Sequence, residues 1–164
     1  MFIERMVVTT TRISRFIALV GLAGLLILAS ATVLDVLLRW LLNKPIVGLN
    51  DTYSMFAAII IASSFPVTMA LRGNVTIRFV GKVLGRRMSN ILDAFGNLVA
   101  TVIFFLMTWQ LWRYADMLYQ DGETTWVLNW PVSPWWRIIT FLVMVNIPVA
   151  FIMAVASIHS AIKK

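Results

Sequence analysis

The side chains that could perform acid–base, nucleophilic or metal chemistry are few in this sequence, and they lie far apart. The chain has one histidine, His159, and no cysteine, so it cannot by itself supply two histidines to a haem iron or a thiolate to any metal. It contains no nucleophile–base pair, phosphate-binding loop or metal-ligand cluster. We therefore expect neither catalysis nor a cofactor, and we interpret His159 as an interfacial residue in contact with water.

Two carboxylates beside apolar segments are the remaining candidates for chemistry. Asp35 is the deeper one, and Asp93 lies at the opposite end of the third apolar segment. A small proton-coupled exporter would need a titratable carboxylate near the middle of the membrane, where a charge is too costly to persist without a function. Asp35 lies instead at the end of its segment, four residues before Arg39, which is the spacing of an ion pair on one helix face. We favour a structural pair and keep the exporter as the alternative.

Four long apolar segments must position these residues, and none of them contains Asp, Glu, Lys, Arg or His. They cover residues 16–34, 52–71, 94–112 and 138–158. Each is long enough to cross a hydrocarbon core roughly 30 Å thick as a helix. With 60% hydrophobic and 13% charged residues and a mean hydropathy of +0.87, the chain is too apolar for a soluble domain. The predicted fold class is an all-α membrane protein with four transmembrane helices in a single domain, residues 1–164.

Breakers and charged pairs near the segment ends extend or stop the predicted helices. The first segment stays apolar as far as Leu38, so we expect a membrane helix there rather than a cleaved signal peptide. Lys44-Pro45 should stop this helix. Arg113 and Asp116, three residues apart, favour a third helix that continues beyond its apolar segment. The predicted membrane helices cover residues 16–42, 51–72, 92–119 and 134–160.

Capping residues and prolines mark the second and fourth helices. Asn50 or Asp51 should cap the start of the second helix, and Ser133 should cap the fourth. Pro66 and Pro148 lie inside these helices, and proline lacks the N–H that a helix interior requires. We therefore expect two of the four helices to be bent.

The distribution of charge predicts the orientation of the chain, whose net charge is +7. Of 14 Lys and Arg residues, ten precede the first helix, lie between the second and third, or follow the fourth. All seven Trp and all three Tyr residues lie toward the other side, as in a one-sided aromatic belt. The positive-inside rule therefore predicts that both termini and the basic central loop are cytoplasmic. This pattern favours anionic lipid, rather than nucleic acid, as the partner of the positive charge.

A short basic amphipathic segment, residues 75–84, follows the second helix, which should end at Gly73. Its apolar residues share most of one helical arc, while Arg78 and Lys82 lie on the other. We expect a short helix lying flat in the inner membrane interface. The alternative is a solvated loop attracted to anionic lipid.

A few small polar residues lie inside the predicted membrane helices. Ser63 lies in the second helix, Asn97 in the third and Asn146 in the fourth. Such residues commonly serve close helix packing and interhelical hydrogen bonds, and they could equally face a partner protein. Because the membrane helices contain so little polarity, the sequence favours a protein that holds another one in place.

Four short motifs lie in the connectors and at the helix ends. They are Arg39-Trp40, Gly48-Leu49-Asn50-Asp51-Thr52, Ala70-Leu71-Arg72-Gly73-Asn74-Val75-Thr76-Ile77, and Gly122-Glu123-Thr124-Thr125 followed by Pro131. In order and loop length they resemble the DctQ-like family, the small membrane subunits of tripartite ATP-independent periplasmic (TRAP) transporters, over nearly the whole chain. Asp51 lies where the family usually has Glu. The chain departs from the family at Val75, where His is frequent, and at Arg78, where an acidic residue is common.

The resemblance implies a non-catalytic scaffold subunit in the bacterial inner membrane. Its implied partners are a large, sodium-driven, elevator-type membrane subunit and a periplasmic binding protein that delivers an organic anion. We expect Asp121 and Glu123, at the tip of the loop before the fourth helix, to dock the binding protein, because exposed charges steer association. The alternative is that this loop, with its Trp residues at the interface, is only a membrane anchor. The residues expected to be structural or to lie at the subunit interface are Asp35, Arg39, Asp51, Ser63, Arg72, Gly73, Asn97, Pro131 and Asn146.

Overall fold

The computed structural model describes residues 2–71 and 86–162, and the regular structure of these residues is helical. The helices are α1 (Phe2–Leu42), α2 (Leu49–Ala70), α4 (Arg86–Gln120), α5 (Ser133–Met144) and α6 (Asn146–Ile162). By length and composition they provide four candidate membrane spans, with α5 and α6 together forming the fourth. The all-α membrane fold is therefore confirmed. Arg72, Gly73 and the predicted amphipathic segment 75–84 lie outside the described residues.

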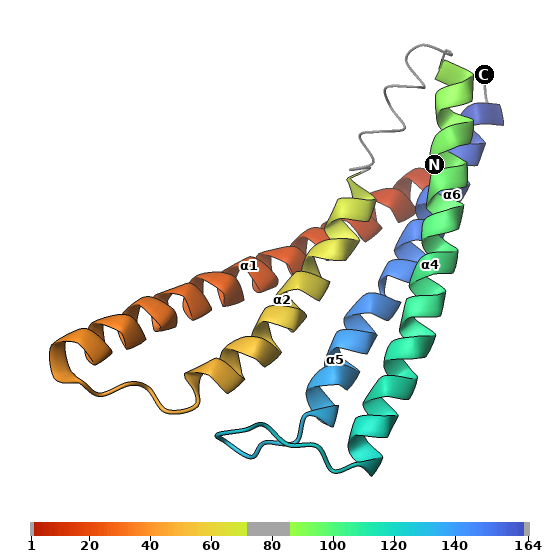
Figure 1. Cartoon of the computed structure of the whole chain (residues 1–164). Coiled ribbons are helices and arrows are strands. Elements are labelled where there is room, and N and C mark those ends of the chain that lie inside the picture. The colour runs from red at the N-terminus through yellow and green to blue at the C-terminus, as the bar shows by residue number, and fades with distance from the viewer. Residues whose placement is uncertain (1, 72–85, 163–164) are drawn as a thin grey trace.

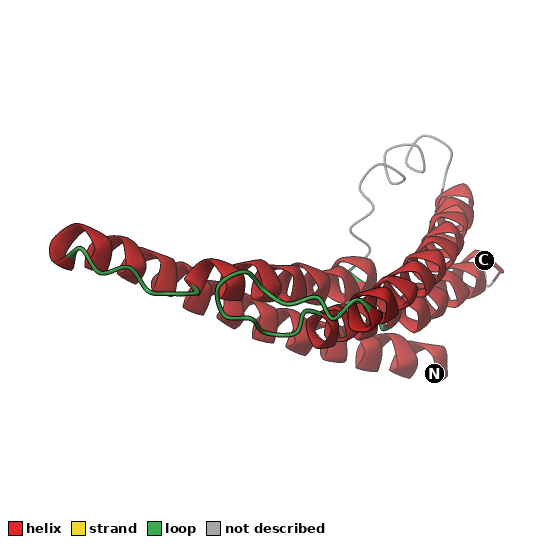
Figure 2. Cartoon of the chain, turned by 60° about the horizontal axis from the view of Figure 1, so that its bottom comes forward, coloured by secondary structure: helices red, strands yellow, loops and turns green. Residues whose placement is uncertain are grey.

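The helices form two antiparallel hairpins. In Figure 1, α1 runs beside α2, and α4 runs beside the α5–α6 pair. The hairpins meet where α2 packs against α5 and α6, and α1 also contacts α6. The two described connectors, residues 43–48 and 121–132, lie at one end of the molecule, which Figure 2 turns toward the viewer.

The first and third helices are longer than the sequence predicts. α1 begins at Phe2 rather than near residue 16, because no Gly or Pro interrupts the polar stretch before the apolar segment. Its 41 residues would extend about 60 Å, which exceeds a hydrocarbon core of roughly 30 Å even when the helix is tilted. α1 ends at Leu42 as predicted, with Asn43 in the left-handed region at φ 50° just before Pro45.

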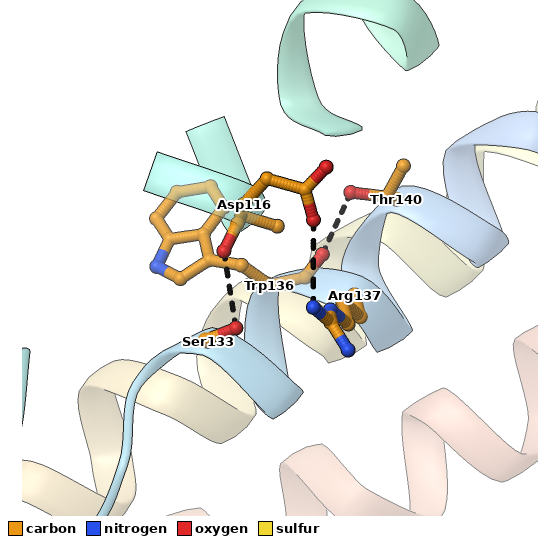
Figure 3. Close-up of polar contacts among 6 residues, drawn as sticks. Asp116, Ser133, Trp136, Arg137 and Thr140 are labelled. Atoms are coloured by element: carbon orange, nitrogen blue, oxygen red, sulfur yellow. Dashed lines mark hydrogen bonds and ion pairs between the residues drawn. The ribbon is translucent and has the colours of Figure 1, made fainter. Parts of the chain in front are cut away.

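Both predicted N-caps are wrong. α2 begins at Leu49 after Gly48, whose φ of 79° turns the chain, and no side chain caps its N–H groups. α5 begins at Ser133 after Val132, also without a side-chain cap. The Ser133 hydroxyl instead donates a hydrogen bond of 3.0 Å to the carbonyl oxygen of Ala115 on α4 (Figure 3). Ser133 thus lies at a helix start, as predicted for a cap, but its hydroxyl bonds to a neighbouring helix instead of to its own.

The predicted Arg113–Asp116 pair is also wrong. Asp116 accepts a hydrogen bond from the Arg137 guanidinium on α5 at 3.4 Å, as Figure 3 shows. The Arg137 guanidinium also lies 5.2 Å from the centre of the Tyr119 ring, within the range of a cation–π contact. Arg137 thus joins α5 to two residues of α4.

The fourth span is interrupted between α5 and α6, so the distortion predicted from Pro148 takes the form of a break. Proline has no N–H to donate to the carbonyl of Met144, four residues earlier, and α5 ends at that residue. The side-chain nitrogen of Asn146, Nδ2, donates to the carbonyl oxygens of Leu142 and Val143, both at 3.1 Å. Asn146 is fully buried, and its side chain gives two carbonyl groups of the last turn of α5 a polar partner within the apolar environment. α2, by contrast, continues through Pro66.

The packed core is small and lies where α2, α4 and α5 meet. Its buried members are Ala62, Phe104, Ile139 and Val143. In the α1–α2 hairpin, Gly21 lies so close to Ser63 that a side chain at position 21 would collide with the Ser63 hydroxyl. Most of the apolar surface of α1 remains exposed, as expected of a helix whose surroundings are lipid or another membrane protein.

Candidate functional site

Asp35 holds the connector between α1 and α2. Its carboxylate is buried, and one oxygen accepts a hydrogen bond from Arg39 at 2.7 Å. The other oxygen accepts one from the backbone N–H of Ile46 at 2.6 Å. The predicted Asp35–Arg39 pair is confirmed, and the bond to Ile46 is an addition that i,i+4 spacing does not reveal. Because both oxygens already have partners, the arrangement is that of a structural carboxylate.

Asp51 holds the other connector. One oxygen of its buried carboxylate accepts hydrogen bonds from the backbone N–H groups of Val127, at 2.8 Å, and Leu128, at 3.0 Å. Bonds from N–H groups to an ionised carboxylate are stronger than those between neutral groups. Asp51 therefore ties the start of α2 to a loop that lies 76 residues later in the chain.

That loop, residues 121–132, is a small hairpin with its own internal bonds. Thr125 donates its N–H to the carbonyl of Trp130 at 2.9 Å and accepts, through its hydroxyl oxygen, the N–H of Trp130 at 3.0 Å. Val132 donates to the carbonyl of Glu123 at 3.0 Å. An antiparallel bridge joins Thr124 to Pro131, one of the predicted site residues. The turn therefore consists of residues 126–129.

The placement of Asp121 and Glu123 at the tip of this loop is wrong. Both residues are exposed, but they lie at the base of the hairpin, beside the end of α4. The turn instead presents Trp126, whose surface is 97% exposed. Asp121, Glu123 and Trp126 belong to one short hairpin. All three are exposed, so they remain available to a partner.

The two connectors touch each other as well. Gly48, in the first connector, lies against Leu128 in the hairpin turn, and a Cβ at position 48 would come within 2.5 Å of the Leu128 side chain. We call residues 43–48 and 121–132 together the connector platform. Its parts are fixed by the Asp35 and Asp51 carboxylates and by this contact, so the platform is a defined surface rather than two independent loops.

The other predicted site residues lie in the membrane-spanning part of the structure. Ser63, Asn97 and Asn146 are all buried. The Ser63 hydroxyl donates to the Ile60 carbonyl of its own helix at 2.6 Å. Asn146 caps the end of α5, and its Oδ1 atom has no hydrogen-bond partner among the described residues. These three residues are thus part of the packing within this chain.

The role of Asp51 is the feature that reasoning from the sequence missed. An acidic residue in the first turn of a helix is ordinarily assigned to its own helix N-terminus. No signal in the sequence would have paired Asp51 with the N–H groups of Val127 and Leu128, because the contact joins residues 76 and 77 positions apart. Among residues 2–71 and 86–162, no group of three His, Cys, Asp or Glu side chains could hold a metal ion.

A protein-family model for the DctQ component of tripartite ATP-independent periplasmic transporters matches residues 28–164. The chain belongs to this family. No match was found among curated proteins or among solved structures. The match covers most of the chain, including both connectors, and confirms the resemblance drawn from their motifs.

Family membership fixes the general role of the chain. The DctQ component is a non-enzymatic, multi-pass membrane part of a tripartite transporter. Such a system also contains a large membrane component and a periplasmic binding protein. The alternative of a self-sufficient exporter is therefore not supported, and the paired Asp35 carboxylate agrees with this conclusion.

Proposed function

We propose that this DctQ component is a scaffold that holds the large membrane subunit in place and offers the connector platform to the binding protein. The large subunit would be the sodium-driven, elevator-type part of the transporter, and the cargo would be an organic anion. The scaffold role is supported by the membrane segments themselves. Residues 16–34, 52–71, 94–112 and 138–158 contain no charged residue and no histidine, so they offer no series of titratable groups along which a proton or ion could move.

The orientation proposed from the sequence places the connector platform in the periplasm and both termini in the cytoplasm. The excess of Lys and Arg at the opposite end of the helices supports this orientation. Reporter enzymes fused after Lys164, or inserted near Gly85, should then report the cytoplasm, and one inserted near Gly122 should report the periplasm. A periplasmic signal at Gly85 would contradict the proposed orientation.

The observation that most supports a docking role is the rigid construction of the platform. A loop that is free in solution must lose conformational entropy on binding, whereas a pre-ordered one does not. Here the hairpin is closed by its own bonds and tied to α2 by Asp51. Its base carries Asp121 and Glu123, both exposed. We infer that these two carboxylates steer the binding protein toward the platform.

Charge reversal tests the docking role. Replacing Asp121 and Glu123 together with Lys should slow uptake at limiting binding protein and alter its salt dependence, because exposed charges act mainly on the association rate. Assembly with the large subunit should be unchanged. The control is matched in charge to a neutral pair at the base of the hairpin: Asp121→Asn with Glu123→Gln removes two negative charges, a change of +2. Ser89→Lys with Asn90→Lys adds the same +2 at the far end of α4 and should leave the salt dependence of uptake intact. Normal uptake by the charge-reversed complex at low salt would exclude the docking role.

A further inference from the structure

A groove lies along α1 on the membrane side of its connector to α2, and the start of α2 closes the connector end with Leu49, Asn50 and Tyr53. Its volume is about 620 Å³, which is within the range of small-molecule binding sites. The part away from the connector is lined by apolar residues of α1, including Leu25, Ala29 and Val33. Polar side chains, those of Arg39, Asn50 and Tyr53, gather at the connector end. The groove is thus mainly apolar along its depth, where the Thr32 hydroxyl donates to the Leu28 carbonyl of its own helix, and it is polar at its mouth.

The depth of the groove matches one leaflet of a bilayer. Its α1 lining extends from Leu25 to Asp35 before reaching Arg39. Ten residues of helix rise about 15 Å at 1.5 Å per residue, which is half of a hydrocarbon core roughly 30 Å thick. An acyl chain that starts at the membrane interface would therefore lie along the apolar lining for the full thickness of its leaflet.

The charge at the mouth is suited to a phosphate group. Arg39 is 64% exposed at its side chain and makes one described bond, to Asp35, although a guanidinium has five N–H donors. Arg side chains bind phosphate through paired N–H donors. Asp35 is the one carboxylate that lines the groove, and both of its oxygens are already held, by Arg39 and by the Ile46 N–H. Lys44 adds a further positive charge to the adjoining connector.

We propose that this groove binds a glycerophospholipid, with one acyl chain along α1 beside the start of α2 and the phosphate at Arg39. The lipid covers the apolar side of α1 ahead of the connector, where α2 lines the groove only at its start. It acts as a structural ligand of the α1–α2 hairpin. This inference does not depend on the docking role of the platform.

Native mass spectrometry of the full-length chain tests the site, with palmitoyl-oleoyl-phosphatidylglycerol as the added lipid. The wild-type chain should retain one lipid after detergent exchange. Ala29→Phe fills the groove from α1 and should lower the retained lipid about tenfold, as expected where an added ring overlaps the ligand. Ala23→Phe is the matched control, since Ala23 is exposed on the same helix but does not line the groove, and it should retain lipid like the wild type. Equal retention by the two variants would overturn the proposal.

A second variant, two other ligands and the assembled complex extend the test. Val33→Trp, a second groove-filling change at an exposed position, should repeat the loss if Ala29→Phe fails to fold. Dioleoylglycerol, which lacks phosphate, should be retained less than phosphatidylglycerol, and inorganic phosphate should not displace the bound lipid. Equal retention of both lipids would overturn the role of Arg39. The complex with the large subunit should keep the lipid, and its loss on assembly would show that protein, not lipid, occupies the groove.

Discussion

The connector between α1 and α2 spans six residues, 43–48, whereas the one between α4 and α5 spans twelve, 121–132. The short connector has one carboxylate bond, from Asp35, which lies 11 residues before the N–H that it binds. The long connector has internal hairpin bonds and two bonds to Asp51, which lies 76 and 77 residues away. One connector is thus held by its own helix, and the other by a helix of the opposite hairpin.

This difference shows how the two hairpins are kept in register at the platform. The internal bonds of the long connector define its shape but not its position relative to α2. Asp51 supplies the position, and the Gly48–Leu128 contact brings the short connector against it. We therefore expect mutations in the long-range contacts to affect both connectors, and mutations at Asp35 to affect mainly one.

The largest effect should come from Asp51→Ala. The substitution removes the acceptor of two backbone N–H groups and releases the hairpin turn from α2. We expect a melting temperature several degrees lower and amide exchange at Val127 and Leu128 faster on the order of tenfold or more. Asp51→Asn should give a melting temperature and exchange rates between those of the wild type and Asp51→Ala, because the Asn carbonyl oxygen still accepts hydrogen bonds but carries no charge. Unchanged exchange in Asp51→Ala would mean that the hairpin is positioned by its own bonds alone.

A somewhat smaller effect should come from Gly48→Ala, which strains the contact between the connectors. A side chain at a φ of 79° and a Cβ within 2.5 Å of Leu128 together should cost about 2 kcal/mol of unfolding free energy. Gly122→Ala is the control, because its φ is 64° but no atom lies within 4 Å of the added Cβ. It should cost about 1 kcal/mol. Adding Leu128→Ala to Gly48→Ala should recover part of the loss, and no recovery would place the cost in the backbone alone.

Asp35→Asn should have a smaller effect, confined to the short connector. The amide oxygen can still accept the Ile46 N–H, while the ion pair with the largely exposed Arg39 is lost. We expect a loss of about 1 kcal/mol in equilibrium unfolding and uptake rates like those of the wild type across pH. Loss of uptake in a variant that assembles normally would give Asp35 a role in transport that the structure does not suggest.

The smallest effect should come from the exposed Asp116–Arg137 pair. Both side chains are about half exposed, and their atoms lie 3.4 Å apart. A double-mutant cycle with Asp116→Asn and Arg137→Gln should give a coupling energy below about 0.5 kcal/mol. A coupling as large as that between Asp51 and the hairpin would show that contacts within the second hairpin also position the platform.

Much of the fold could be predicted from local patterns. The four apolar segments, the end of the first helix at Leu42, the disturbance near Pro148 and the Asp35–Arg39 pair all depend on residues close together in the chain. Their physical basis, the length that crosses a bilayer and the 3.6-residue period of a helix, is contained in a short window of sequence. The connector motifs also allowed the family to be recognised.

The tertiary structure decided which polar groups meet. Ser133, Asp51 and Asp116 each lie at a position where local rules predict a cap or a neighbouring pair, yet each has its observed partner 18 to 77 residues away. Local rules fail here because packing brings other partners close: the turn offers N–H groups to Asp51, while α4 and α5 lie side by side at Ser133 and at Asp116. The sequence by itself therefore determined the helices and where they turn, while the packing of the two hairpins determined the connector platform, because only that packing brings Asp51 to the turn at Val127 and Leu128.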